Sequence, residues 1–231
     1  MKRIILLATL ILSACQATVP TSKSQTAELT TSTQAESTVN QKAQSEMSIT
    51  SKGIGKAKLG MTLRELKKIS TKDTDFEVIP SFLDDVDAIA VTKKGIVQYY
   101  ILYDLENSSE SDLTVALEDR VIRALVTDND NYQTKSGIKV GTLIQKAEEI
   151  YGNAILTYNT AGESREYITF GNENPNNIKF RASYFKLISD GMGYSGIYPE
   201  YPGVSYTTDK YHNDAAIAAI EVVCDSDDCT N

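Results

Sequence analysis

Two short segments of the chain share one pattern, a Gly turn followed by Thr and then an amphipathic run. Lys58-Leu59-Gly60-Met61-Thr62 leads into residues 63–69, and Lys139-Val140-Gly141-Thr142 leads into residues 143–150. In both, Glu or Gln stands three residues after the Thr, as in a capping box, where the two side chains satisfy free N–H groups at a helix start. The pattern predicts two short helices, each of which must pack on a larger element to persist.

Each predicted helix has one apolar face, and the second helix has a clear end. The faces consist of Leu63, Leu66 and Ile69 in the first helix and of Leu143, Ala147 and Ile150 in the second. The capping boxes are expected between Thr62 and Glu65 and between Thr142 and Gln145. Gly152 follows the second helix and is the residue type preferred at a C-terminal cap.

Short runs of β-branched and aromatic residues predict a sheet on which these helices pack. The runs are Ile89–Val91, Ile96–Tyr103, Val121–Val126, Ala154–Tyr158, Tyr167–Phe170, Ile178–Tyr184 and Ile217–Val223. Because the intervening turns are short, we expect antiparallel hairpins. The predicted fold class is α+β, an antiparallel meander with two short capped helices. Residues 53–134 and 135–231 form either two related helix-plus-meander units or one domain whose helices have similar caps by coincidence.

The N-terminal region differs from the rest of the chain. Lys2 and Arg3 precede an apolar run from Ile4 to Leu12, which ends in Leu12-Ser13-Ala14-Cys15 and is too short to span a bilayer. This stretch resembles the lipobox of bacterial lipoproteins. The resemblance implies that residues 1–14 are a signal peptide and that Cys15 carries lipid, so a lipid anchor attaches the protein to a membrane. Gln16 after the cysteine, by analogy with enterobacterial lipoproteins, implies an outer-membrane location facing the periplasm.

Residues 15–50 are predicted to be a tether and residues 51–231 the folded domain. The segment after Cys15 is rich in Ser, Thr, Gln and Ala and has few large apolar residues, Leu29 and Met47 among them. It cannot bury enough apolar surface to offset the entropy lost on ordering, so we expect a flexible segment.

The charge of the chain disfavours nucleic acid as a partner. The formal net charge is -8, and loss of Lys2 and Arg3 with the signal peptide takes it to -10. An acidic surface also repels anionic headgroups, so membrane contact is expected through the acyl chains rather than through a basic patch. Solubility alone is a sufficient reason for this charge.

Beyond Cys15, the chain has two cysteines, which an oxidising compartment would join. Cys224 and Cys229 are therefore expected to form a disulfide that holds only the C-terminal tail, because the loop between them is short. Calcium binding by Asp225, Asp227 and Asp228 is the alternative, although a calcium loop's Gly and distal Glu are missing. Zinc binding has less support, since His212 is the only histidine. We assign no metal and no cofactor.

The least regular stretch of the predicted domain runs from Ser189 to Tyr206. Long loops in compact domains are commonly functional, and this one contains Tyr194, Tyr198 and Tyr201, a residue type common in recognition surfaces. These three tyrosines are the candidate partner-binding residues. The alternative is a compact loop whose tyrosines lie over the edge of the sheet.

Catalytic patterns in the sequence are weak. Gly193-Tyr194-Ser195-Gly196 is similar to a nucleophile elbow, but Ile197 stands where that motif needs a second Gly. Any Ser-His chemistry would use His212, with Asp209 or Asp214 orienting it. Carboxylates such as Asp84, Asp85 and Asp87 are close in sequence, but nothing shows that they meet in a cleft. We assign no catalytic residue and expect no enzyme.

A longer pattern is similar to the RpoE-regulated lipoprotein family. It comprises Gly53-Ile54-Gly55, residues 128–142 and Tyr151-Gly152, and it covers residues 53–152. The resemblance implies an exported lipoprotein, and because the molecular function of that family is unknown it supplies no functional residues. Related Gly-turn-helix units occur in tandem-repeat β-lactamase inhibitory proteins and in the small lipoprotein of the outer-membrane barrel assembly machinery, which is an analogy of fold only.

Three functions remain open at this point. The first is an envelope lipoprotein that binds a protein partner or has a structural role. The second is an inhibitor or immunity-type lipoprotein that blocks a hydrolase, such as a basic lysozyme, through the acidic surface or the Tyr loop. The third is an enzyme acting on cell-wall material.

Overall fold

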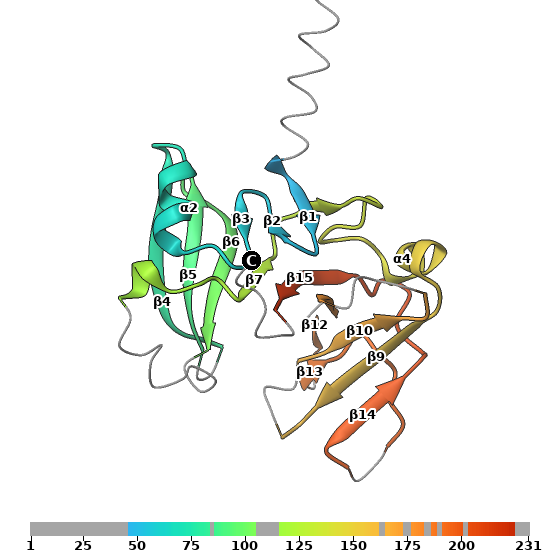
Figure 1. The fold of residues 1–231 in the computed structure, drawn as a ribbon. Helices are drawn as coiled ribbons and strands as arrows, with labels where there is room; N and C mark the ends of the chain where they lie inside the picture. Colours follow the sequence, from blue (N-terminus) through green and yellow to red (C-terminus); the bar gives the residue numbers. More distant parts are fainter. Residues whose placement is uncertain are drawn as a thin grey trace, which may run out of the picture. The chain divides into compact units, whose positions relative to one another are not determined.

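The computed structural model describes residues 46–83, 86–104, 116–161, 165–172, 177–182, 186–188, 191–200 and 203–224. The helices are α2 (Leu63–Ile69), the 3-10 helix η1 (Leu117–Asp119) and α4 (Ile144–Tyr151) (Figure 1). The strands are β1 (Ser48–Thr50), β2 (Gly53–Ile54), β3 (Ala57–Lys58), β4 (Thr74–Leu83), β5 (Val86–Lys93), β6 (Ile96–Asp104), β7 (Ala124–Thr127), β8 (Gln133–Thr134), β9 (Ala154–Asn159), β10 (Tyr167–Phe170), β11 (Ile178–Ala182), β12 (Lys186–Ile188), β13 (Gly191–Gly193), β14 (Ser205–Thr208) and β15 (Ile217–Val223).

The largest sheet has nine strands in the order β14-β9-β10-β11-β15-β7-β6-β5-β4. All of its neighbouring strands are antiparallel. In the first half α2 is followed by β4, β5, β6 and β7, and in the second half α4 is followed by β9, β10, β11 and β15. Each half is thus a helix followed by four neighbouring strands, and the fourth strands, β7 and β15, pair with each other. The α+β class is confirmed, and the two halves have the same order.

Both helices pack on the same face of this sheet. Leu63 and Leu66 of α2 and Ile144 and Ala147 of α4 belong to one buried cluster with alternate residues of the strands. Leu125 of β7 is opposite Val222 of β15, and both are buried in that cluster. The core therefore continues across the junction of the two halves.

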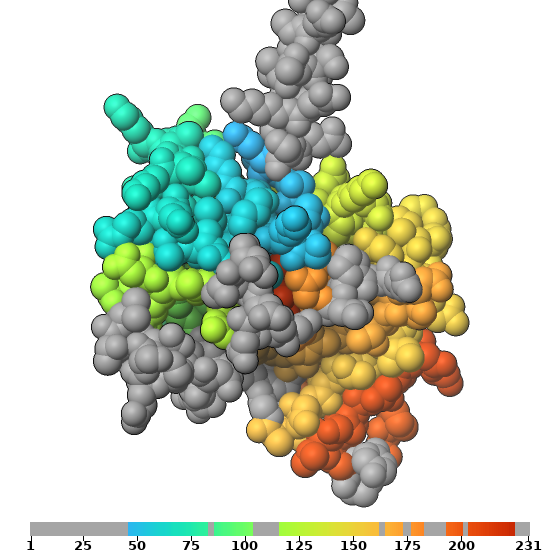
Figure 2. Space-filling model, in the orientation of Figure 1, coloured from blue at the N-terminus to red at the C-terminus, as the bar shows by residue number. Residues whose placement is uncertain are grey.

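A smaller sheet, in the order β3-β2-β1-β8, lies at the start of the described chain. β1 pairs antiparallel with β2 and parallel with β8, and Figure 2 shows this blue segment adjoining the yellow-green residues near β8. Gly53 has φ +149 and a Cβ there would lie 2.1 Å from the carbonyl oxygen of Ala57, so only Gly fits. Because β1 precedes residue 51, the folded part begins earlier than predicted.

The first helix agrees with the sequence prediction. α2 spans Leu63–Ile69, the Thr62 side chain accepts a hydrogen bond from the Glu65 N–H, and the Glu65 carboxylate accepts one from the Thr62 N–H. This capping box is confirmed. Ile69, by contrast, is half exposed and was wrongly assigned to the buried face.

The second helix differs from its prediction by one residue. α4 begins at Ile144, and its N-cap is Leu143, which makes no side-chain hydrogen bond. The predicted capping box between Thr142 and Gln145 is therefore wrong. The Thr142 hydroxyl instead accepts from the Lys139 N–H at 3.1 Å. Leu143 pairs with Ala216 just before β15, and this bridge keeps residue 143 extended and moves the helix start.

The shift also changes the buried face of α4. Its buried residues are Ile144, Ala147 and Tyr151, whereas Leu143 and Ile150 are exposed, contrary to the prediction. Gly152 ends the helix at φ +79 and its N–H donates to the carbonyl of Glu148 at 2.8 Å. The predicted C-terminal cap is therefore confirmed.

Seven predicted strands correspond to strands of the nine-stranded sheet, two of them with the predicted ends, Tyr167–Phe170 and Ile217–Val223. The start predicted at Val121 is wrong, because Val121 forms only an isolated bridge with Thr62 and β7 begins at Ala124. The prediction missed β4 and β14, which lie at the two edges of the sheet. Pro80 within β4 disfavours a strand, but an edge strand tolerates it because one side of its backbone has no partner strand.

Replacing Thr62 by Ala is expected to lower the free energy of unfolding by about 1 kcal/mol, because the helix loses its N-cap. The matched control is Thr142→Ala, which removes the same side chain at the other Gly-Thr turn but no helix cap. We expect Thr142→Ala to lower the free energy of unfolding by less than half as much as Thr62→Ala. Urea unfolding of the two variants measures the difference, and equal losses would contradict the assignment of the caps.

Candidate functional site

Four tyrosines form a cluster on the edge strand β14, its neighbour β9 and the segment before β14. This tyrosine cluster consists of Tyr158, Tyr194, Tyr198 and Tyr206, all half-buried. Tyr158 and Tyr206 are directly opposite in the sheet, and their rings are parallel within 1° with centroids 4.6 Å apart. Tyr194 stacks on Tyr158 with a centroid distance of 3.9 Å. Three rings therefore form one continuous stack.

Tyr198 lies edge-on to this stack. Its ring makes an angle of 82–83° with the other three, at centroid distances of 4.7 Å from Tyr158, 5.8 Å from Tyr194 and 6.3 Å from Tyr206. Edge-to-face contact is a favoured geometry for aromatic rings. The Tyr198 hydroxyl donates to Oε1 of Glu166 at 2.8 Å.

Glu166 is a buried carboxylate that holds the segment around Tyr198 in place. Only 1% of Glu166 is exposed. Its oxygens accept hydrogen bonds from the backbone N–H of Ser195 at 2.8 Å and of Gly196 at 2.7 Å, in addition to the Tyr198 hydroxyl. A buried carboxylate needs such donors to replace its hydration. Burial and the nearby Glu166 both raise the pKa of Tyr198 well above its ordinary value.

The segment from Ser195 to Tyr198 is also hydrogen-bonded to the last residue of β14 and to a residue just after this strand. The Ile197 N–H donates to the carbonyl of Lys210 at 2.7 Å, and the Thr208 hydroxyl donates to the carbonyl of Ile197 at 2.8 Å. Gly196 is required here, because a Cβ would lie 2.7 Å from ring carbons of Tyr198. The compact-loop alternative thus describes Tyr194 and Tyr198, while Tyr201 lies outside the described residues.

The structure brings two of the residues considered for catalysis, Ser195 and His212, together through a backbone hydrogen bond. Ser195 is buried, and its backbone N–H and carbonyl bond to Glu166 and to the N–H of His212. His212, Asp209 and Asp214 are exposed. Gly196 contacts Tyr198 and so has a packing role in the elbow-like motif.

The other acidic candidates are dispersed or lie outside the described residues. Asp87 accepts a hydrogen bond from the backbone N–H of Ser81, and Asp84 and Asp85 are not among the described residues. Within the described ranges, His, Cys, Asp and Glu form no group of three or more that would hold a metal ion. Asp225, Asp227 and Asp228 lie beyond the last of these ranges.

The residues that carry the lipoprotein prediction lie outside the described ranges, so the signal peptide and Cys15 stay predictions. Cys224 is disulfide-bonded. Its predicted partner Cys229 is also outside these ranges, and the pairing stays a prediction. Among the described helices none is both long and apolar enough to cross a bilayer.

A small cleft of about 50 Å³ lies at the other edge of the large sheet. It is lined by residues from the start of the described chain, from the end of α2 and from β4, β5 and β6, including Glu46, Thr71 and Lys93. Lys56 forms an ion pair with Glu46 at 3.5 Å in its wall. No residue of the tyrosine cluster lines it.

Sequence reasoning identified Tyr194 and Tyr198 but missed Glu166, Tyr158 and Tyr206. The alternation of β9 places Tyr158 on the same face as Leu156, so strand periodicity was a usable signal for it. β14 was not predicted, so Tyr206 had no strand to belong to. Glu166 precedes a strand like many exposed acidic residues, and nothing local marks it as buried.

No protein-family model and no curated protein matches the sequence. A solved structure similar to this chain is the crystal structure of the uncharacterized protein yfeY from Escherichia coli. The sequences are 15% identical, the TM-score is 0.44, and the match covers 77% of this chain and 99% of the other. The resemblance to the RpoE-regulated lipoprotein family has no family-model match and stays a prediction.

Replacing Tyr198 by Phe is expected to lower the free energy of unfolding by about 1–2 kcal/mol, because the buried Glu166 carboxylate loses a donor. The matched control is Tyr103→Phe, whose buried hydroxyl has no hydrogen-bond partner in the described structure. We expect that variant to be neutral or slightly more stable. If urea unfolding gives equal costs for the two variants, Glu166 does not depend on Tyr198.

Alkaline pH is expected to destabilise the fold from about pH 10 upwards. Burial raises the pKa of Tyr103 and Tyr132 to about 12. The unfolded chain releases these protons near pH 10 and the folded chain retains them, so the contribution of these two tyrosines to stability is constant below about pH 10 and is lost between about pH 10 and 12. Unfolding free energies and tyrosinate absorbance measure this, since the chain has no Trp. Ionisation of all tyrosines near pH 10 before unfolding would contradict it.

Proposed function

We propose that this protein is a lipid-anchored module of the bacterial envelope that binds a partner protein through the tyrosine cluster. The lipobox-like stretch ending in Cys15 supports the anchor, and Gln16 supports attachment to the outer membrane with the domain facing the periplasm. The observation that carries the binding role is the half-exposed, stacked tyrosine cluster held by buried Glu166.

Such a cluster has the physical properties of an interface centre. Tyrosine combines a large apolar ring with a polar tip and is enriched at protein interfaces. The rings here already contact one another, and Tyr198 is hydrogen-bonded to Glu166, so binding orders few side chains. A surface that is rigid before binding loses less entropy in the complex.

The same geometry favours a broad partner surface over an active-site cleft. Tyr194 and Tyr198 lie against Tyr158 and are not held out from the sheet. A segment that blocks the cleft of a hydrolase has to project into it, so the inhibitor alternative gains no specific support from these contacts. The cell-wall enzyme alternative also gains no specific support from Ser195, whose backbone N–H donates a hydrogen bond to Glu166.

Site-specific photo-crosslinking of the lipidated full chain in intact envelopes tests this proposal. A crosslinker on the edge strand β14, at Ser205, should capture one protein of defined mass. The double variant Tyr194→Ser with Tyr206→Ser should reduce capture at least tenfold, since central aromatic residues often contribute more than about 1.4 kcal/mol each. Labelling with palmitate, in the native chain and in Cys15→Ser, reports the lipid anchor separately.

The matched control is Tyr100→Ser, which removes a half-buried tyrosine of β6 outside the cluster. Capture in this variant should equal that of the native chain, with folding of all variants verified by circular dichroism. Absence of a specific crosslink, or an equal decrease in the control, would refute binding through the cluster. Absence of palmitate on Cys15 would refute the anchor.

A further inference from the structure

The net negative charge of the chain lies outside residues 46–104. Residues 46–104 contain nine Lys and Arg and nine Asp and Glu, whereas residues 105–231 contain ten and twenty. The region containing α2, β4, β5 and β6 is therefore close to neutral overall. The expectation that the whole surface repels anionic headgroups does not hold for this part.

Within this region, unpaired lysines gather at one end. Earlier in α2, Arg64 pairs with Asp119 at 2.7 Å and Lys67 pairs with Glu118 at 2.8 Å. Four lysines that follow Lys67 in the sequence have no ion pair within 4.0 Å in the described part of the chain. They form the lysine end and are Lys68, Lys72, Lys93 and Lys94.

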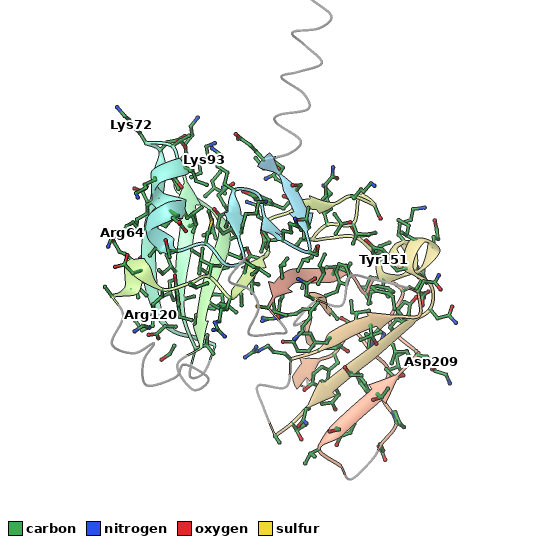
Figure 3. The ribbon with its side chains drawn as sticks, in the orientation of Figure 1. Arg64, Lys72, Lys93, Arg120, Tyr151 and Asp209 are labelled. Carbon is green, nitrogen blue, oxygen red and sulfur yellow. The ribbon has the colours of Figure 1, made fainter. Side chains whose placement is uncertain are left out.

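Backbone contacts place Lys93 and Lys94 beside the turn that contains Lys72, and Lys68 lies in the last turn of α2, just before that turn. The Lys94 N–H donates to the carbonyl of Asp73 at 3.0 Å, and Lys93 is opposite Thr74 in the β4–β5 ladder. Figure 3 shows Lys72 and Lys93 at the same end of the α2, β4 and β5 elements. Asp73 is the acidic residue between them, and its carboxylate accepts a hydrogen bond from the Thr71 hydroxyl. Asp73 attracts Lys93 and Lys94, and Glu65 attracts Lys68, so acidic neighbours offset part of the positive charge at this end.

The lysine end lies where the N-terminal segment enters the fold. Glu46, the first described residue, lines the same cleft as Ser70, Thr71 and Lys93. Cys15 stands 31 residues earlier in the sequence. A flexible coil of that length spans roughly 30 Å, so a domain tethered through Cys15 would remain close to the membrane.

We propose that the lysine end binds the anionic phospholipid headgroups of the membrane that carries the anchor. This rests on the lipid anchor of the proposed function. Each lysine near an anionic surface strengthens binding by roughly fivefold, and the tether supplies a high local concentration of headgroups. The tyrosine cluster lies at the opposite edge of the sheet, eight strand spacings of about 4.8 Å away. Headgroup binding at one edge would therefore leave the cluster directed away from the membrane.

Hydrogen exchange of the lipidated full chain tests this proposal on vesicles of phosphatidylcholine, with and without phosphatidylglycerol. Backbone amides of residues 70–74 and 93–96 should exchange at least roughly fivefold more slowly on the anionic vesicles than on the neutral ones. Amides of β9 and β14 should not change. Physiological salt should weaken the protection because it screens exposed charges.

Two variants of equal charge change separate a local effect from net charge. The test variant replaces each of the four lysines of the lysine end by Gln. The control variant makes the same change at four exposed lysines of the second half, namely Lys135, Lys139, Lys146 and Lys210. Protection on anionic vesicles should be lost in the test variant and kept in the control.

The outcomes distinguish the membrane from other sources of phosphate and from failure of the anchor. Equal exchange on the two vesicles, or equal loss in the two variants, would overturn the proposal. So would protection by inorganic phosphate in the absence of vesicles, which would indicate a site for a single anion. Flotation with neutral vesicles reports the anchor alone, so a floating protein without protection rejects the lysine end and not the proposed function.

Discussion

The pairing of β7 with β15 is the interaction on which the architecture depends. It joins two helix-plus-strand halves into one sheet, with Leu125 of β7 opposite Val222 of β15. In the described part of the chain each half has one short α-helix to cover its strands, and α2 has only seven residues. Short helices persist through tertiary packing. The continuous core across the junction supplies that packing for both halves.

β15 also carries polar structure on the face opposite the helices. Glu221 is 5% exposed and forms an ion pair with Arg181 of the neighbouring strand β11, while the Tyr167 hydroxyl donates to the same carboxylate. A buried charge is costly unless it is paired and hydrogen-bonded. The central strand of the sheet therefore has apolar contacts on one face and an ion pair on the other, which favours a single register of β15 against β11.

Sequence reasoning succeeded where local chemistry decides the outcome. The Thr62 box, the Gly152 cap and the ends of β10 and β15 all follow from short-range pattern. It failed at α4, where a bridge between Leu143 and the residue before β15 overrides the same pattern. That bridge joins positions 73 residues apart, and no local signal contains it.

The candidate site is less predictable than the fold for a related reason. The tyrosine cluster combines β9, β14 and the segment before β14, and it is held by Glu166 from outside all three. Each residue is ordinary in its own sequence context. Only the tertiary arrangement makes Glu166 a buried acceptor and brings Tyr158 between two other rings. Composition had identified the tyrosine-rich segment, but not the strand residues that complete the cluster.

The two edges of the nine-stranded sheet have opposite chemistry. β14 and β9 carry stacked aromatic rings, whereas the end of β5 and the turn before β4 carry lysines without ion pairs in the described part of the chain. Because one hydrogen-bonded sheet connects these edges, an orientation imposed at one edge is transmitted to the other without a flexible joint between them. A membrane that binds the lysines would therefore hold the tyrosine cluster at the opposite edge of the same sheet.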